Sequence, residues 1–192
     1  MPHLGPDAWS YVVLALTLIV AAATDIRTGK IYNWTTYPAA LAGLVGHAVT
    51  GGWWGDSEHL GLAGSLAGLA AGFAPLLLAW LAGGIGGGDA KVMGAVGALV
   101  GWRFALTSLF YGLAVAVLMA VCIMLRKKVV RDTLGRLWRF FLLWAGKAKP
   151  DAPITPQSPT VPFGLALCIG AATALVLTCI YGPANRMFLL GL

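Results

Sequence analysis

The sequence has few charged residues, no paired cysteines and no common metal- or nucleotide-binding motif. Only 10% of its 192 residues are charged, and seven of these are acidic. Because Cys122, Cys168 and Cys179 form no Cys-x-x-Cys pair, we interpret them as small buried hydrophobic residues. His-Glu-x-x-His is absent, and no Gly-Lys-Ser/Thr follows the glycine-rich segment. We therefore expect no metal, no cofactor and no nucleic-acid partner.

Hydrophobic residues are abundant and make up 59% of the chain. A soluble domain of this length cannot bury so much apolar surface, and several segments approach the ~20 residues that a spanning helix needs. The pattern predicts six spanning helices, at about residues 9–24, 35–50, 60–83, 90–101, 104–125 and 162–181. We expect an all-α polytopic membrane protein that forms a single membrane-embedded domain over residues 1–192.

The basic residues indicate how these helices are oriented, because loops rich in Lys and Arg stay cytoplasmic. If the N-terminus lies outside, eleven of the thirteen basic residues fall at the inner face, and only Arg103 and Arg186 fall outside. The distribution predicts that both termini lie outside the cytoplasm. Asp25 and Asp89, at the ends of two different helices, then lie at the same inner face.

The longest polar segment, residues 126–161, is expected to be cytoplasmic. Apolar residues recur at helical spacing over residues 131–145, opposite Arg136 and Arg139, which is typical of an amphipathic helix in the headgroup region. Recurring prolines predict an extended connector over residues 146–161. The favoured interpretation is a basic loop anchored to anionic lipid, and guidance of a substrate is the alternative.

Small residues are regularly spaced in the third predicted helix, where Gly64, Gly68 and Gly72 recur four residues apart. This spacing lets another helix approach closely, so we assign these glycines to helix packing.

Two acids stand out because an ionised carboxylate is disfavoured in a bilayer. Asp89 has a structural alternative as the N-cap of the helix that follows it. Asp25 has no such structural alternative if its helix ends at this residue, because its carboxylate would then face the negative end of the helix dipole. The glycines over residues 86–88 remove side chains beside Asp89 and permit unusual backbone conformations, so an extended peptide could lie against this strip.

Two aspartates that approach each other favour aspartyl hydrolysis. Like charges at short range favour a state in which the pair holds one proton. The ionised partner then activates water, while the protonated partner polarises the scissile carbonyl. Arg27 and Lys91 each follow an acid by two residues and could stabilise its ionised form, if helical geometry aims them toward it.

Three segments together resemble the bacterial type IV prepilin peptidase family. Gly86-Gly87-Gly88-Asp89-Ala90-Lys91-Val92-Met93 is similar to that family's Gly-x-Gly-Asp-x-Lys-Leu motif. Asp25-Ile26-Arg27, followed by Ile31-Tyr32-Asn33, resembles its first aspartate segment, with Tyr32 in place of a proline. Pro162-Phe163-Gly164 resembles its Pro-Phe-Gly element, and the three segments occur in the family's order.

The resemblance implies an intramembrane aspartyl endopeptidase in the bacterial inner membrane. Such enzymes remove the short basic leader of prepilins at the cytoplasmic face, usually after glycine. The chain resembles the short, peptidase-only Flp/Tad-type members, because it lacks the N-terminal region with paired Cys-x-x-Cys motifs. We therefore expect no methyl transfer and no S-adenosylmethionine. The expected partners are prepilins and membrane lipids, and a homodimer is left open.

Carried over residue by residue, the resemblance makes Asp25 and Asp89 the catalytic pair. The supporting or substrate-binding candidates are Gly86, Gly88, Lys91, Arg27, Asn33, Pro162, Phe163 and Gly164. Pro162 would help to position the substrate, or alternatively would be the N1 residue of the last helix.

Two other functions remain open from the residues alone. A small cation or proton-coupled transporter could use the inner-face acids, but it should also place polar groups near mid-membrane on several helices. A scaffold that binds pilin without cutting it would share the substrate but would not depend on two carboxyl groups.

Overall fold

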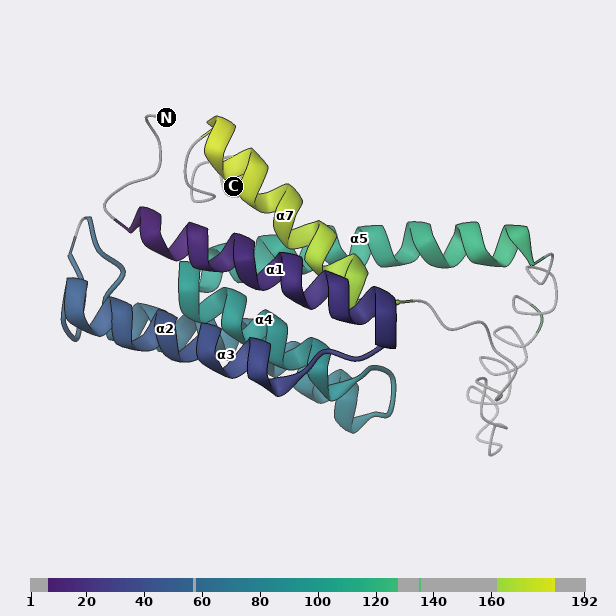
Figure 1. Ribbon diagram of the computed structural model, residues 1–192, viewed down its shortest axis with the longest axis horizontal. Coiled ribbons are helices and arrows are strands. Elements are labelled where there is room, and N and C mark those ends of the chain that lie inside the picture. The colour runs from purple at the N-terminus through teal and green to yellow at the C-terminus, as the bar shows by residue number, and fades with distance from the viewer. Residues whose placement is uncertain (1–6, 57, 128–134, 136–161, 182–192) are drawn as a thin grey trace. The chain divides into compact units, whose positions relative to one another are not determined.

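The computed structural model describes residues 7–56, 58–127, 135 and 162–181 (Figure 1). These described residues form helices and contain no strand, which confirms the predicted all-α class. The helices are α1 (Ala8–Thr28), α2 (Asn33–Gly51), α3 (Gly61–Leu81), α4 (Gly87–Val100), α5 (Trp102–Arg126) and α7 (Phe163–Tyr181). Each lies within a few residues of a helix that the sequence predicted.

The two helix ends that carry the acids differ from the prediction in a way that matters for the site. The first apolar run does not end at Thr24, because α1 continues to Thr28 and is terminated by the left-handed Gly29 (φ 62°). The Gly29 amide donates to the Asp25 carbonyl over 2.8 Å, so Asp25 lies inside the last turn. The N-cap of α4 is Gly86, which places Asp89 in the first turn and corrects its expected N-cap position.

Four helices, α1, α3, α5 and α7, are long and apolar enough to cross a membrane. Helix α4 has 14 residues, and at 1.5 Å per residue it extends only about 21 Å, less than the ~30 Å of a bilayer core. The structure thus supports four of the six predicted spans. Spanning by α2 and α4, and the orientation in the membrane, stay predictions.

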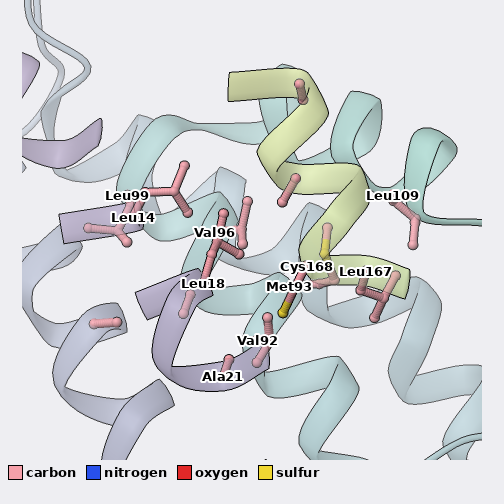
Figure 2. Packing of buried hydrophobic residues seen from close by; sticks show 14 of the residues in the cluster. Leu14, Leu18, Ala21, Val92, Met93, Val96, Leu99, Leu109, Leu167 and Cys168 are labelled. Carbon is pink, nitrogen blue, oxygen red and sulfur yellow. The ribbon is translucent and has the colours of Figure 1, made fainter. Parts of the chain in front are cut away.

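Helix α4 is the most buried element of the described chain. Every residue from Val92 to Leu99 is buried, and α4 contacts α1, α2, α3 and α7. The hydrophobic core therefore forms around this helix. Figure 2 shows side chains of α1, α4 and α7 in that core, among them Leu14, Leu18, Ala21, Val92, Met93, Val96, Leu167 and Cys168. Of the cysteines, only Cys168 is buried; Cys122 and Cys179 are exposed, against the prediction.

Glycines bring α3 and α4 into backbone contact. A Cβ on Gly68 would overlap the carbonyl oxygen of Gly97, and a Cβ on Gly97 would overlap that of Gly68. Nearby, the buried Ser65 hydroxyl donates to the Ala98 carbonyl over 2.6 Å. The packing role predicted for the α3 glycines fits Gly68 and also Gly72, whose added Cβ would overlap the Met93 carbonyl oxygen of α4. Gly64 differs, because the atoms nearest to its added Cβ belong to Leu60, just before α3.

A polar cluster joins the start of α1 to the ends of α2 and α4. The buried His47 uses its Nε2–H to donate to the Leu99 carbonyl over 2.8 Å. Its Nδ1 lies 3.6 Å from the Asp7 carboxylate, which also accepts a bond from His59 Nδ1 over 3.1 Å. These contacts lie at the opposite end of α1 and α4 from the two acids.

The chain divides into two compact units, Met1–Val115 with Pro162–Leu192, and Ala116–Val161. All residues of the candidate site belong to the first unit. The predicted amphipathic helix at 131–145 and the connector at 146–161 fall in the second unit and, apart from Gly135, lie outside the described residues.

Candidate active site

Asp25 is held by the N-terminus of a helix far away in the sequence. Its side chain is 7% exposed, and its Oδ2 accepts the amide of Leu165, in the first turn of α7, over 2.7 Å. Amides in a first helical turn have no partner inside their own helix, and the positive end of the helix dipole favours an anion there. The positive end of α7 therefore offsets the unfavourable position of the Asp25 carboxylate near the negative end of its own helix.

Asp89 is held by its own helix start. It is 8% exposed, and its Oδ2 accepts the Gly86 amide over 3.2 Å. This contact satisfies one of the orphan amides of α4, so Asp89 does stabilise the helix end, although from the first turn rather than from the N-cap position. Its second oxygen, Oδ1, points to α7.

The two acids converge on Gly164, a buried residue in the first turn of α7. A Cβ added to Gly164 would lie 2.9 Å from Asp89 Oδ1 and 3.0 Å from Asp25 Cγ. The separation of Asp89 Oδ1 and Asp25 Cγ cannot exceed the sum of these distances, about 6 Å. The structure thus brings together the two acids that the sequence paired, and Gly164 leaves them room because it has no side chain.

Gly86 and Gly88 differ in the space around them, so the expected open strip beside Asp89 is not continuous. Gly86 is exposed and extended (φ −76°, ψ 141°), and its Cβ would meet the Asp89 carboxylate at 3.2 Å. A Cβ on Gly88 would instead meet the Cβ and the carbonyl oxygen of Ile31, both at 3.1 Å. The expectation of free space beside Gly88 is therefore wrong, because the loop between α1 and α2 covers it.

Lys91 connects α4 to α2 rather than to the acids. Its Nζ donates to Asn33 Oδ1 over 2.8 Å and lies 5.3 Å from the centre of the Tyr37 ring. Arg27 is exposed. Among the described residues, no ion pair joins a Lys or Arg to Asp25 or Asp89. The predicted electrostatic support from Arg27 and Lys91 is therefore not found as a direct contact, and Lys91 with Asn33 fixes the relative position of two helix starts.

Pro162 and Phe163 form the entry to α7. The Pro162 carbonyl accepts the amide of Ala166 over 3.3 Å, and α7 begins at Phe163. Pro162 therefore precedes the helix instead of being its N1 residue. The half-buried Phe163 packs against the hydrophobic core. The two residues thus lie just before Leu165, whose amide binds Asp25.

Two residues near the acids were not identified from the sequence. The δ-methyl group of Ile31 would lie 2.7 Å from a Cβ on Gly164. Cys168, one turn beyond Gly164, is buried on the same helix within electrostatic range of both carboxyl groups. The signal for Ile31 in the sequence is its place in the Ile31-Tyr32-Asn33 segment, which was noted above without a role for Ile31 itself. No group of three or more His, Cys, Asp or Glu that could bind a metal occurs among the residues described.

Comparison with protein families gives a match to this chain. The model described as "Type IV leader peptidase family" matches residues 12–124, more than half of the chain, which includes most of α1, all of α2 to α4 and most of α5, with both acids. Comparison with curated proteins and with solved structures finds no match.

Proposed function

Because this chain belongs to the type IV leader peptidase family, we propose that it is an aspartyl endopeptidase with Asp25 and Asp89 as its catalytic pair. Its proposed substrate is a Flp/Tad-type prepilin, whose basic leader it removes after glycine at the cytoplasmic face of the inner membrane. The observation that carries the proposal is the convergence of two buried carboxyl groups, from different helices, on one glycine.

The pair supplies both the base and the acid that amide hydrolysis needs. Two carboxyl groups this close hold one proton between them, because two adjacent anions repel each other. The ionised group takes a proton from water, and the resulting hydroxide attacks the scissile carbonyl carbon. The protonated group gives its proton to the carbonyl oxygen. When the tetrahedral intermediate collapses, the first group gives its proton to the leaving amine, and the second group takes a proton back from a hydroxyl group, whose oxygen becomes the carbonyl oxygen of the new carboxyl terminus.

The amide donors fix where this chemistry takes place. Leu165 holds Asp25 through Oδ2, and Gly86 holds Asp89 through Oδ2, which leaves Asp89 Oδ1 directed to the space beside Gly164. Groups held in this way need little reorganisation when the reaction begins. The reaction uses only water and these two groups, and so it needs no cofactor.

Polar groups inside the helices give little support to a transporter. The hydroxyls of Thr17, Thr107, Thr173 and Thr178 each donate to the carbonyl four residues earlier in their own helix. Hydroxyls bonded in this way do not form a chain that could pass ions or protons between helices. A transport function is therefore the weaker alternative, although buried Ser108 has no partner in the described structure.

The proposal is tested by expressing the chain together with a candidate prepilin and scoring loss of the leader by a mobility shift. We expect Asp25→Ala, Asp89→Ala and Asp89→Asn each to lower cleavage by about 10²- to 10⁴-fold, the usual contribution of a general acid or base. Asn at position 89 keeps an oxygen that can accept the Gly86 amide, so this variant should remain folded. Full cleavage by Asp89→Asn would remove Asp89 from the mechanism.

Asp56→Asn is a matched control. Asp56 lies in the loop between α2 and α3 and accepts backbone amides of Glu58 and His59, so it resembles Asp89 in its bonding but lies away from the pair. We expect this variant to cleave like the wild type. Cleavage that persists in both alanine variants would exclude the aspartate pair as the catalytic groups, whereas absence of cleavage by the wild type would favour a scaffold or a transporter.

A further inference from the structure

Ile31 lies beside the aspartate pair, and its side chain is among the nearest neighbours of both Gly88 and Gly164. The residue comes from the loop between Gly29, which ends α1, and Asn33, which starts α2. Its Cβ and carbonyl oxygen lie against Gly88 of α4, and its δ-methyl group lies against Gly164 of α7. Ile31 therefore contacts the start of α4, which carries Asp89, and the start of α7, whose Leu165 amide binds Asp25.

The δ-methyl group is close to both carboxyl groups. A Cβ on Gly164 would be 2.7 Å from Ile31 Cδ1, 2.9 Å from Asp89 Oδ1 and 3.0 Å from Asp25 Cγ. By the same addition of distances, Cδ1 lies within about 6 Å of each acid. Ile31 is half-buried and packs against the hydrophobic core, which restricts how far its side chain can withdraw.

A substrate must bring its scissile carbonyl within hydrogen-bond reach of both acids. The neighbouring Cα is only about 1.5 Å from the carbonyl carbon, so a side chain on it enters the space next to the pair. Gly88 and Gly164 contribute no side chain to that space, whereas Ile31 contributes a branched apolar one. Ile31 is therefore a side chain at the site that can limit the size of the residue that fits.

We propose that Ile31 is a specificity-determining residue that restricts the substrate residue next to the scissile bond to a very small one. The inference depends on the proposed peptidase function, and it assigns the size selection to one side chain in the loop between α1 and α2. A purely structural role for Ile31 makes a different prediction, because loss of packing would lower cleavage of every substrate by the same factor.

The test compares cleavage of a prepilin series with Gly, Ala, Ser or Val at the residue before the scissile bond, and of a second series altered at the residue after it. The enzymes are the full-length wild type, Ile31→Ala and Ile31→Val. Ile31→Val removes the δ-methyl group itself and retains most of the packing, so it keeps the test valid if Ile31→Ala folds poorly.

We expect Ile31→Ala to raise the ratio of Ala- to Gly-substrate cleavage about tenfold or more in one of the two series, the usual discrimination of one methyl group in an apolar site. Ile31→Val should give a smaller increase in the same series. Ile26→Ala is the matched control, because Ile26 adjoins Asp25 but is 65% exposed. Its cleavage ratios should equal those of the wild type.

An unchanged ratio in both series, with Gly-substrate cleavage retained or lowered uniformly, would overturn the role of Ile31. That outcome is distinct from failure of the proposed function, which would appear as wild-type enzyme that does not cleave the Gly substrate, or as cleavage that survives loss of Asp25 and Asp89.

Discussion

Gly164→Ala should separate activity from stability in this protein. The added methyl group would lie 2.9 Å from Asp89 Oδ1, 3.0 Å from Asp25 Cγ and 2.7 Å from Ile31 Cδ1. Carbon atoms pack best at about 3.5–4.0 Å, so the neighbours must move by about half an ångström or more. The end of the Ile31 side chain can rotate, but each carboxyl group is tied to a backbone amide.

The expected effects on folding and on catalysis differ in size. Overpacking costs about 1–3 kcal/mol, while alanine in place of glycine in a helix returns about 0.5–1 kcal/mol. The net loss of stability should therefore be about 0–2.5 kcal/mol. Displacement of reacting groups by a fraction of an ångström to 1 Å lowers rates by up to about 10²-fold. We expect cleavage to fall about 10- to 100-fold in a protein that remains folded.

The measurement combines the mobility-shift assay on a coexpressed prepilin with thermal unfolding of the purified protein in detergent. Gly84→Ala is the matched control, because a Cβ there would meet only the Ala79 carbonyl oxygen at an ordinary 3.4 Å. Wild-type cleavage by Gly164→Ala would refute the reasoning, since it would mean that the two acids need not approach at this point.

Three further changes test other parts of the structure. Gly97→Ala should lower the free energy of unfolding by about 1–3 kcal/mol, because its methyl group would overlap backbone of α3; an unchanged thermal midpoint would contradict that contact. Lys91→Met should slow cleavage far less than loss of either acid, since it removes only an exposed bond to Asn33, and complete inactivation in the mobility-shift assay would give Lys91 a direct role. The hydrogen bond to Asp7 raises the pKa of His59 above its ordinary 6.5. The stability that protonated His59 contributes is therefore present below pH 6.5 and is lost as the pH rises through the raised pKa. A difference in thermal unfolding midpoint between wild type and His59→Gln that does not shrink above pH 6.5 would contradict this.

The proximity of Asp25 and Asp89 could be predicted from the sequence, because it follows from two kinds of local information. Counting helices placed Asp25 and Asp89 at one face, and each acid lies in a short motif. The structure adds how they are held. The hydrogen bond from the Leu165 amide to Asp25 joins residues 140 positions apart, and no local sequence pattern predicts it. The same holds for Ile31, whose importance comes from contacts with glycines of two other helices.

The errors in the predicted helix ends have a common physical cause. Composition suggests that a helix ends where apolar residues stop, so the first one was expected to end at Thr24. The helix instead continues past Asp25 to Thr28, and the Asp25 carboxyl group accepts the Leu165 amide of α7, a tertiary contact that local propensity does not contain. Likewise, the glycine run suggested a loop before Asp89, whereas the first turn of α4 begins within it.

The burial of α4 has a consequence for how the acids can be positioned in a membrane. Helices that touch lipid must match the thickness of the hydrocarbon, and mismatch is relieved by tilt or by deformation of the bilayer. Helix α4 is wrapped by α1, α2, α3 and α7 along Val92–Leu99, so lipid imposes no such length on it. Its 14 residues need not reach either membrane surface. The depth of Asp89 in the membrane is therefore set by packing against the neighbouring helices.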